Sequence, residues 1–178
     1  MKTGALLIAA LLAAGTPGAA TDLTPDAMTR ATTLNPSEGD VACLTDGRTP
    51  DTDPGATAFS WDSVGLLVVE WEAPVSLTSV RMYLGLVNQY AVYTYLGGRF
   101  DEHGQREGEA VPTYTRNGIV PFDATGWYEV TMPSDARIDN LGLQVINGAM
   151  LYEVQFIGPG GTPVTPTSLG LVKRSFSR

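Results

Sequence analysis

Between positions 41 and 158, short apolar runs alternate with glycine, proline, asparagine and aspartate, a pattern typical of β-strands joined by turns. Several runs alternate strictly: Val80, Met82 and Leu84 are expected to face one way, and Arg81 and Tyr83 the other. No run of comparable length carries an apolar stripe with the helical period of 3.6 residues. The strands predicted most clearly are 66–71, 79–84, 90–96, 127–132, 141–146 and 151–157.

These runs recur at spacings near ten residues with no helix between them. Such an order predicts an all-β fold, an antiparallel β-sandwich in a single domain. We expect Pro74 to end the 66–71 strand, because proline cannot donate a hydrogen bond to a neighbouring strand. Residues 97–121 are polar, charged and rich in glycine, and they predict a long excursion that contains a small hairpin.

The chain ends differ from this middle part. In residues 1–20 the basic Lys2 precedes a ten-residue apolar run at 5–14, and Gly18 and Ala20 supply the small residues of a cleavage site. Ten residues cannot span a hydrocarbon core of roughly 30 Å, so the pattern predicts a removed signal peptide and no membrane span in the mature form. The expected location is secreted, periplasmic or at the cell surface.

The mature chain divides into three parts by pattern. Residues 21–34 form an N-terminal segment in which Thr24, Pro25 and Asp26 predict a short helical turn. Residues 35–158 hold the predicted sandwich, and 159–178 combine a Pro/Gly/Thr linker with a basic tail. The tail fits a docking or sorting peptide, or simply a frayed terminus.

Composition narrows the function classes. Of the 178 residues, 43% are apolar and 17% are charged, which excludes a charge-rich disordered chain. The net charge of −8 repels phosphate backbones, so we expect no nucleic-acid partner. Cys43 is the only cysteine, so no intramolecular disulfide can form, and a small buried side chain is a better interpretation than a reactive thiol.

The order of several short motifs resembles the discoidin or galactose-binding-like family of β-sandwich modules. The motifs are Leu44-Thr45-Asp46-Gly47, then Trp61, then LLVVEWEAPVSLTSVRMYLG at 66–85, and LYEVQFIG at 151–158. This resemblance implies an eight-stranded jelly-roll sandwich that is usually non-catalytic. It also implies binding of glycans, lipid headgroups or proteins through loops at one end.

The resemblance further implies a structural Ca²⁺ between the Asp-Gly loop and the acidic residue of the last strand. Loop 46–55 offers carboxylates and hydroxyls, the oxygen ligands that Ca²⁺ prefers, although Asp, Thr and Pro are also ordinary turn residues. Glu153 is the sharper signal, because a carboxylate in an apolar strand needs a partner if it is buried. The candidate metal ligands are Asp46, Asp51, Thr52 and Glu153.

A sugar site combines an aromatic platform with polar groups that bind hydroxyls. Tyr93 and Tyr95 should project together from one strand face, unless they pack in the core, as we expect for Trp61, Trp71 and Trp127. His103 lies in a charged stretch that is also typical of a solvated loop tip. The candidate ligand-binding residues are Tyr93, Tyr95, Arg99, Phe100, His103 and Arg106.

Three functions remain. The first is an exported, non-catalytic module that binds carbohydrate, either a glycan or a cell-surface polysaccharide. The second is a structural or adhesive surface protein that binds another protein, for instance one of the cell envelope. The third is a glycan hydrolase with paired carboxylates at 101–102 or 107 and 109, but these lie on a glycine-rich segment, whereas catalysis needs rigid placement.

Overall fold

The computed structural model describes residues 20–32, 36–121, 124, 126–133 and 137–160. The predicted signal peptide, apart from Ala20, and positions 161–178 of the predicted linker and tail lie outside these residues. All strand pairs are antiparallel, as predicted. The elements are η1 (Thr24–Asp26), β1 (Met28–Ala31), β2 (Ser37–Glu38), η2 (Val41–Thr45), β3 (Phe59–Trp61), β4 (Gly65–Ser76), β5 (Ser79–Leu96), β6 (Arg99–Phe100), β7 (Arg106–Glu107), β8 (Val111–Ile119), β9 (Gly126–Thr131) and β10 (Arg137–Ile157).

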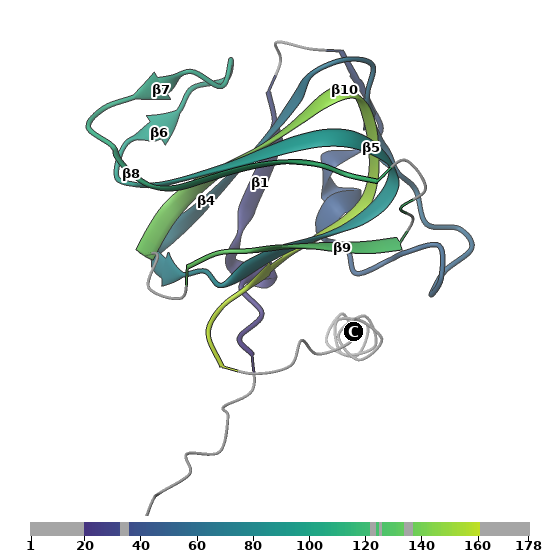
Figure 1. Cartoon of the computed structure of the whole chain (residues 1–178), viewed down its shortest axis with the longest axis horizontal. Helices are drawn as coiled ribbons and strands as arrows, with labels where there is room; N and C mark the ends of the chain where they lie inside the picture. Colours follow the sequence, from purple (N-terminus) through teal and green to yellow (C-terminus); the bar gives the residue numbers. More distant parts are fainter. Residues whose placement is uncertain (1–19, 33–35, 122–123, 125, 134–136, 161–178) are drawn as a thin grey trace, which may run out of the picture.

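Two long strands, β5 and β10, pair with each other and are shared by both layers of the sandwich (Figure 1). Their register shifts between Ile146 and Ala149, where Asn147 and Gly148 have φ of 67° and 74°. This left-handed backbone lets the strands turn from one layer into the other. The first layer runs β1–β4–β10–β5–β8, and the second runs β2–β3–β10–β5–β9.

The core lies between the layers and follows the predicted alternation. Leu141, Leu143 and Val145 are fully buried in the first layer, and Val80 and Met82 in the second. Alternate residues of the same strands point outward, because side chains alternate across a sheet. The jelly-roll sandwich predicted from the strand pattern and the motif order is therefore the observed fold.

The predicted packing of the three tryptophans is right for two of them. Trp61 and Trp71 belong to the core. Trp127 is only half-buried, because it lies opposite Tyr83 on the outward face of the second layer. There the Arg81 guanidinium lies 4.6 Å from the centre of its ring.

Strand lengths differ from the prediction in three places. The runs 79–84 and 90–96 are halves of β5, and 141–146 and 151–157 are halves of β10. Pro74 does not end its strand, because it lies where the β4–β10 register is irregular and no donor is required. The 97–121 excursion does contain the predicted hairpin, β6–β7, but Val111–Ile119 forms β8 and pairs with β5.

The N-terminal segment is joined to the sheet. The predicted turn forms as η1, with Pro25 in its first turn, and β1 then pairs with β4. Leu23 accepts a hydrogen bond from the Trp71 indole at 3.2 Å and donates its amide to Phe156 at 2.8 Å. Both described chain ends therefore meet at the end of the sandwich opposite the bend. Among the described residues, no helix is both long enough and apolar enough to cross a membrane.

Candidate functional site

The β6–β7 hairpin follows the end of β5 (Figure 1), and its contacts place it against the outward face of the first layer. Phe100 is 8% exposed and lies against Gly142 of β10. A Cβ atom at position 142 would lie only 3.2 Å from the Phe100 ring, so glycine allows the hairpin to lie close to the sheet.

Arg106 of the hairpin is held between two aromatic rings. Its guanidinium carbon lies 4.0 Å from the centre of the Tyr95 ring and 4.6 Å from that of Phe100. The guanidinium also donates to the carbonyl of Gly97 at 2.8 Å and to the side-chain oxygen of Asn140. Burial lowers the pKa of Arg106, yet a guanidinium stays charged at neutral pH. This stack fixes the hairpin to the sheet.

Further contacts fix the same hairpin from two other strands. Arg30 of β1 donates to the carbonyl oxygens of Phe100 (2.6 Å) and Asp101 (3.0 Å). Asn140 of β10, which is 2% exposed, donates to the carbonyl of Gly97 at 3.2 Å. The hairpin is therefore a preorganised part of the surface.

A concavity of about 360 Å³ lies beside this hairpin, and we call it the hairpin hollow. Three carboxylates, one exposed arginine and one amide converge on it. Oε1 of Glu70 is buried and has no hydrogen-bond partner among the described residues. The residues that line the hairpin hollow are Met28, Glu70, Trp71, Glu72, Gly98, Arg99, Asp139 and Asn140.

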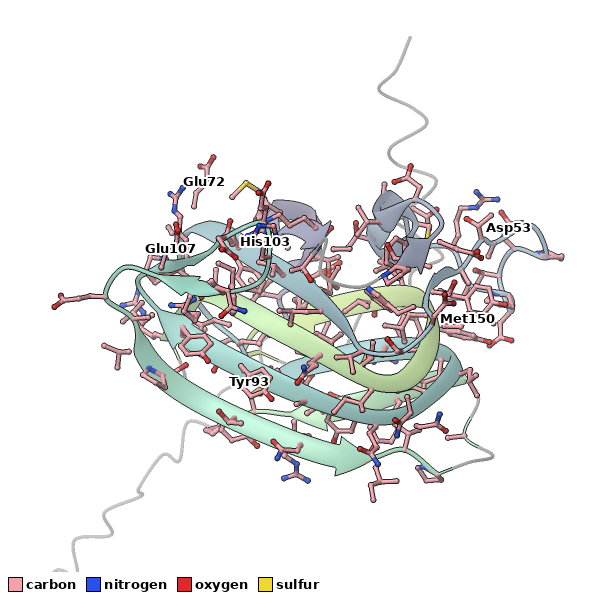
Figure 2. The ribbon with its side chains drawn as sticks, turned by 90° about the horizontal axis from the view of Figure 1, so that it is seen from above. Asp53, Glu72, Tyr93, His103, Glu107 and Met150 are labelled. Atoms are coloured by element: carbon pink, nitrogen blue, oxygen red, sulfur yellow. The ribbon has the colours of Figure 1, made fainter. Side chains whose placement is uncertain are left out.

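The six predicted ligand residues are divided between different places. Tyr95, Phe100 and Arg106 form the closed stack, and only Arg99 lines the hairpin hollow. Tyr93 projects on the same strand face as Tyr95, as predicted, but lies beyond the hairpin. Figure 2 shows Tyr93 on the sheet, apart from the residues labelled at the hairpin end.

The hairpin tip is made of exposed polar residues. His103 is exposed and lies 3.4 Å from a carboxylate oxygen of Glu102. Asp101 accepts the backbone amides of His103 (2.9 Å) and Gln105 (2.7 Å), which stabilises the turn. In Figure 2, Glu72, His103 and Glu107 lie at one end of the molecule and Asp53 lies at the other.

The Asp-Gly loop covers the outward face of the second layer in a similar way. Glu153 of β10 is 2% exposed, and its Oε2 accepts the backbone amide of Gly47 at 3.0 Å. The structure thus brings Asp46 and Glu153 into neighbouring positions, as the resemblance implied. Asp46 also accepts the amide of Arg48 at 2.8 Å.

The other two predicted metal ligands form contacts within the loop and with β5. Asp51 accepts a hydrogen bond from Tyr83. Thr52 donates to the carbonyl of Thr49 at 3.1 Å and accepts the Thr49 amide at 3.1 Å. Among the described residues, no group of three or more His, Cys, Asp and Glu side chains is arranged to hold a metal. A calcium shell of six to eight oxygens at Asp46 and Glu153 would therefore need backbone carbonyls and water.

The Asp-Gly loop also affects the pKa values of two nearby groups, Cys43 and Tyr83. Burial, and secondarily the Asp46 carboxylate, raises the pKa of the Cys43 thiol, so the thiolate is disfavoured and the residue acts as a buried side chain. Burial and the hydrogen bond to Asp51 raise the pKa of Tyr83 to about 12.

The sequence did not point to several residues that build the hairpin hollow. Glu70 and Asn140 lie opposite each other on neighbouring strands, and Asp139 precedes Asn140. The available signal was a polar residue inside an apolar strand, the same signal that singled out Glu153. Arg30 offered no signal, because its contacts are to hairpin backbone 70 and 71 positions away.

Solved structures share this fold at low sequence identity. The family 32 carbohydrate-binding module from Clostridium perfringens NanJ, solved with galactose, is 13% identical with a TM-score of 0.56, covering 78% of this chain and 98% of that one. The Clostridium perfringens module CpGH89CBM32-5, solved with GalNAc-β-1,3-galactose, is 10% identical with a TM-score of 0.53, covering 78% and 99%.

Chitosan-binding module 1 from a Paenibacillus sp. IK-5 chitosanase/glucanase is 11% identical with a TM-score of 0.54, covering 78% of this chain and 99% of that module. No protein-family model matches the sequence, and no curated protein matches it either. The comparisons confirm the galactose-binding-like, discoidin-like fold that the motif order predicted.

Proposed function

We propose that this protein is an exported, non-catalytic module that binds carbohydrate in the hairpin hollow. The observation that carries the proposal is a preorganised concavity at the loop end of the sandwich. Its rim presents Arg99 and Glu72, and its backbone is fixed by Arg106 and Asn140. A volume of about 360 Å³ is in the range of small-molecule sites.

The lining chemistry supports a polyhydroxylated ligand. Carboxylates accept hydrogen bonds from sugar hydroxyls, and Arg99 donates hydrogen bonds to hydroxyl oxygens. The lining can therefore pair with hydroxyls both as donors and as acceptors. Met28, which is 53% exposed, offers apolar surface for the carbon side of a ring. The solved neighbours that were crystallised with galactose and GalNAc-β-1,3-galactose have the same fold.

The placement of the candidate acids favours binding over hydrolysis. Asp101 accepts two backbone amides of its own turn, and Glu102 lies against His103. A glycosidase needs two carboxyl groups held at a fixed separation across the substrate bond. Export rests on the signal-like pattern of residues 1–20.

A structural Ca²⁺ held by Asp46 and Glu153 is a separate proposal. It would tie the Asp-Gly loop to the last strand, and its binding free energy would add to folding stability. The buried Glu153 carboxylate beside Asp46 supports it.

A glycan array tests the binding proposal with the full mature chain. We expect specific sugar binding that falls about tenfold in Arg99→Ala and in Glu72→Gln, because each loses hydrogen bonds to the ligand. Glu129→Gln is the matched control, since Glu129 is an exposed carboxylate on the second layer.

Three results would contradict the proposal. Equal binding by Arg99→Ala and Glu129→Gln would mean that the sugar does not bind in the hairpin hollow. Failure of every glycan, with capture of one envelope protein, would favour the adhesive alternative. Hydrolysis of a bound glycan that Asp101→Asn or Glu107→Gln abolishes would make the protein an enzyme.

A further inference from the structure

A second concavity lies on the same outward face, beyond the hairpin. It has a volume of about 410 Å³ and lies where β8, β5 and β10 run side by side. We call it the Tyr93 hollow. Its lining includes Gln89, Ala91, Tyr93, Asn117, Ile119 and Ile146.

The two hollows are separate. Tyr95 packs against Arg106, whereas Tyr93 and Ala91 precede it on the same face of β5 and do not contact Arg106 in this stack. Ala91 is four residues from Tyr95, a distance of about 13 Å along a strand. A ligand in one hollow therefore need not touch the other.

The Tyr93 hollow differs from the hairpin hollow in charge. Among the described residues that line it, none is charged. The nearest cation of β8, Arg116, is directed to the hydroxyls of Tyr114 and Tyr90, which raise its pKa. Amide groups supply both donors and acceptors here, and the Tyr93 hydroxyl donates to Oε1 of Gln144 at 3.1 Å.

This lining discriminates between kinds of occupant. An ion would find no counter-charge, and a purely apolar ligand would leave the amides of Gln89 and Asn117 unpaired and dehydrated. A neutral sugar satisfies both requirements, because its hydroxyls pair with amides and its apolar side packs on Tyr93. Ile119, which is 75% exposed, adds apolar surface at the open side.

We propose that the Tyr93 hollow is a second sugar-binding subsite, selective for neutral saccharide units. This inference rests on the proposed carbohydrate-binding function and extends it to a second place on the same face. Two subsites on one face allow a branched or long glycan to bind both, which raises the overall affinity without any new contact.

The test compares Tyr93→Ala, Asn117→Ala and Arg99→Ala with wild type on one array of neutral and charged glycans. We expect both Tyr93→Ala and Asn117→Ala to weaken binding of neutral glycans about tenfold and to leave charged glycans unchanged. Arg99→Ala should weaken a different set of glycans. Tyr93→Phe, which keeps the ring and loses the hydroxyl, should show a smaller loss than Tyr93→Ala.

The outcomes separate the two proposals. If Tyr93→Ala and Asn117→Ala bind every neutral glycan as wild type does, or if wild type binds charged glycans alone, the second subsite is wrong and the hairpin hollow stands. If wild type binds no glycan at all, the proposed function itself fails. Thermal unfolding of each variant checks the fold, and if Tyr93→Ala is unfolded, Asn117→Ala alone decides.

Discussion

Two loops cover the two outward faces of the sandwich, and they do so with opposite charges. On the first layer, the β6–β7 hairpin is held by a cation, Arg106, between the rings of Tyr95 and Phe100. On the second layer, the Asp-Gly loop is held by an anion, Glu153, whose carboxylate accepts the amide of Gly47.

We call the hairpin the first cover and the Asp-Gly loop the second cover. The two covers stabilise their buried charges in different ways. Arg106 has two rings and two oxygen acceptors around it, so its charge is stabilised by side chains and by a single backbone carbonyl. The Glu153 carboxylate accepts a backbone amide, and this hydrogen bond fixes the path of the loop. The hairpin borders the hairpin hollow, and the Asp-Gly loop connects the early part of the domain to its last strand.

Removing the Arg106 side chain should have the largest effect on the stability of the hairpin and on binding. Arg106→Ala loses two cation–π contacts and two charged hydrogen bonds, and we expect about 3 kcal/mol less stability of the hairpin. Binding at the hairpin hollow should be lost, while binding that depends on Tyr93 persists. Hydrogen exchange of residues 97–108 measures the loosening. Arg106→Lys is the control, and full protection in Arg106→Ala would show that the stack does not hold the hairpin.

The second cover should respond to the loss of Glu153. Glu153→Ala removes the buried acceptor of the half-buried Gly47 amide, which should lower the free energy of unfolding by about 2 kcal/mol. Glu153→Gln keeps an acceptor oxygen and should be milder in metal-free buffer.

Chelation then tests the calcium proposal on the same pair. EDTA should lower the Tm of wild type and leave that of Glu153→Gln unchanged, because the ion stabilises only the protein that binds it. Calorimetric scans with and without added Ca²⁺ measure this difference. An unchanged wild-type Tm would exclude a stabilising ion, and the Glu153 carboxylate would then stabilise the loop through its contact with the Gly47 amide.

The two covers also show what the sequence could predict. Alternation in 80–84 and 141–145 was sufficient for the strands and their inward faces, because burial on one side of a sheet imposes period two. Glu153 was detected because a carboxylate interrupts an apolar strand. Arg106 was named only as one of several polar residues, because its partner Tyr95 and its acceptor Asn140 are brought to it by tertiary packing. The continuity of β5 and β10 was missed for the same reason, since the bend lies within paired strands.

A smaller change should separate the hairpin from the sheet without removing any polar contact. In Gly142→Ala the new Cβ would lie 3.2 Å from the side chains of both Leu66 and Phe100, so these side chains must move by a few tenths of an ångström. We expect a loss of about 1 kcal/mol in unfolding free energy and weaker binding at the hairpin hollow. Equal binding by Gly142→Ala and wild type would mean that close approach of the hairpin is unnecessary.

The smallest expected effect is the pH dependence of the free energy of unfolding that Tyr83 causes beneath the Asp-Gly loop. Burial and the hydrogen bond to Asp51 raise the pKa of Tyr83 from its ordinary value of 10 to about 12. The unfolded chain therefore releases this proton first as pH rises, so the stabilisation is complete below pH 10 and is lost between about pH 10 and 12. Because Tyr90 is also buried and its pKa is raised, the informative quantity is the difference between wild type and Tyr83→Phe. Urea unfolding across this pH range should show a steeper fall for wild type, and parallel curves would mean that Tyr83 is not protonated preferentially in the folded state. If the stability of Asp51→Asn falls less steeply with pH than that of wild type, part of the effect comes from the hydrogen bond between Tyr83 and the Asp-Gly loop.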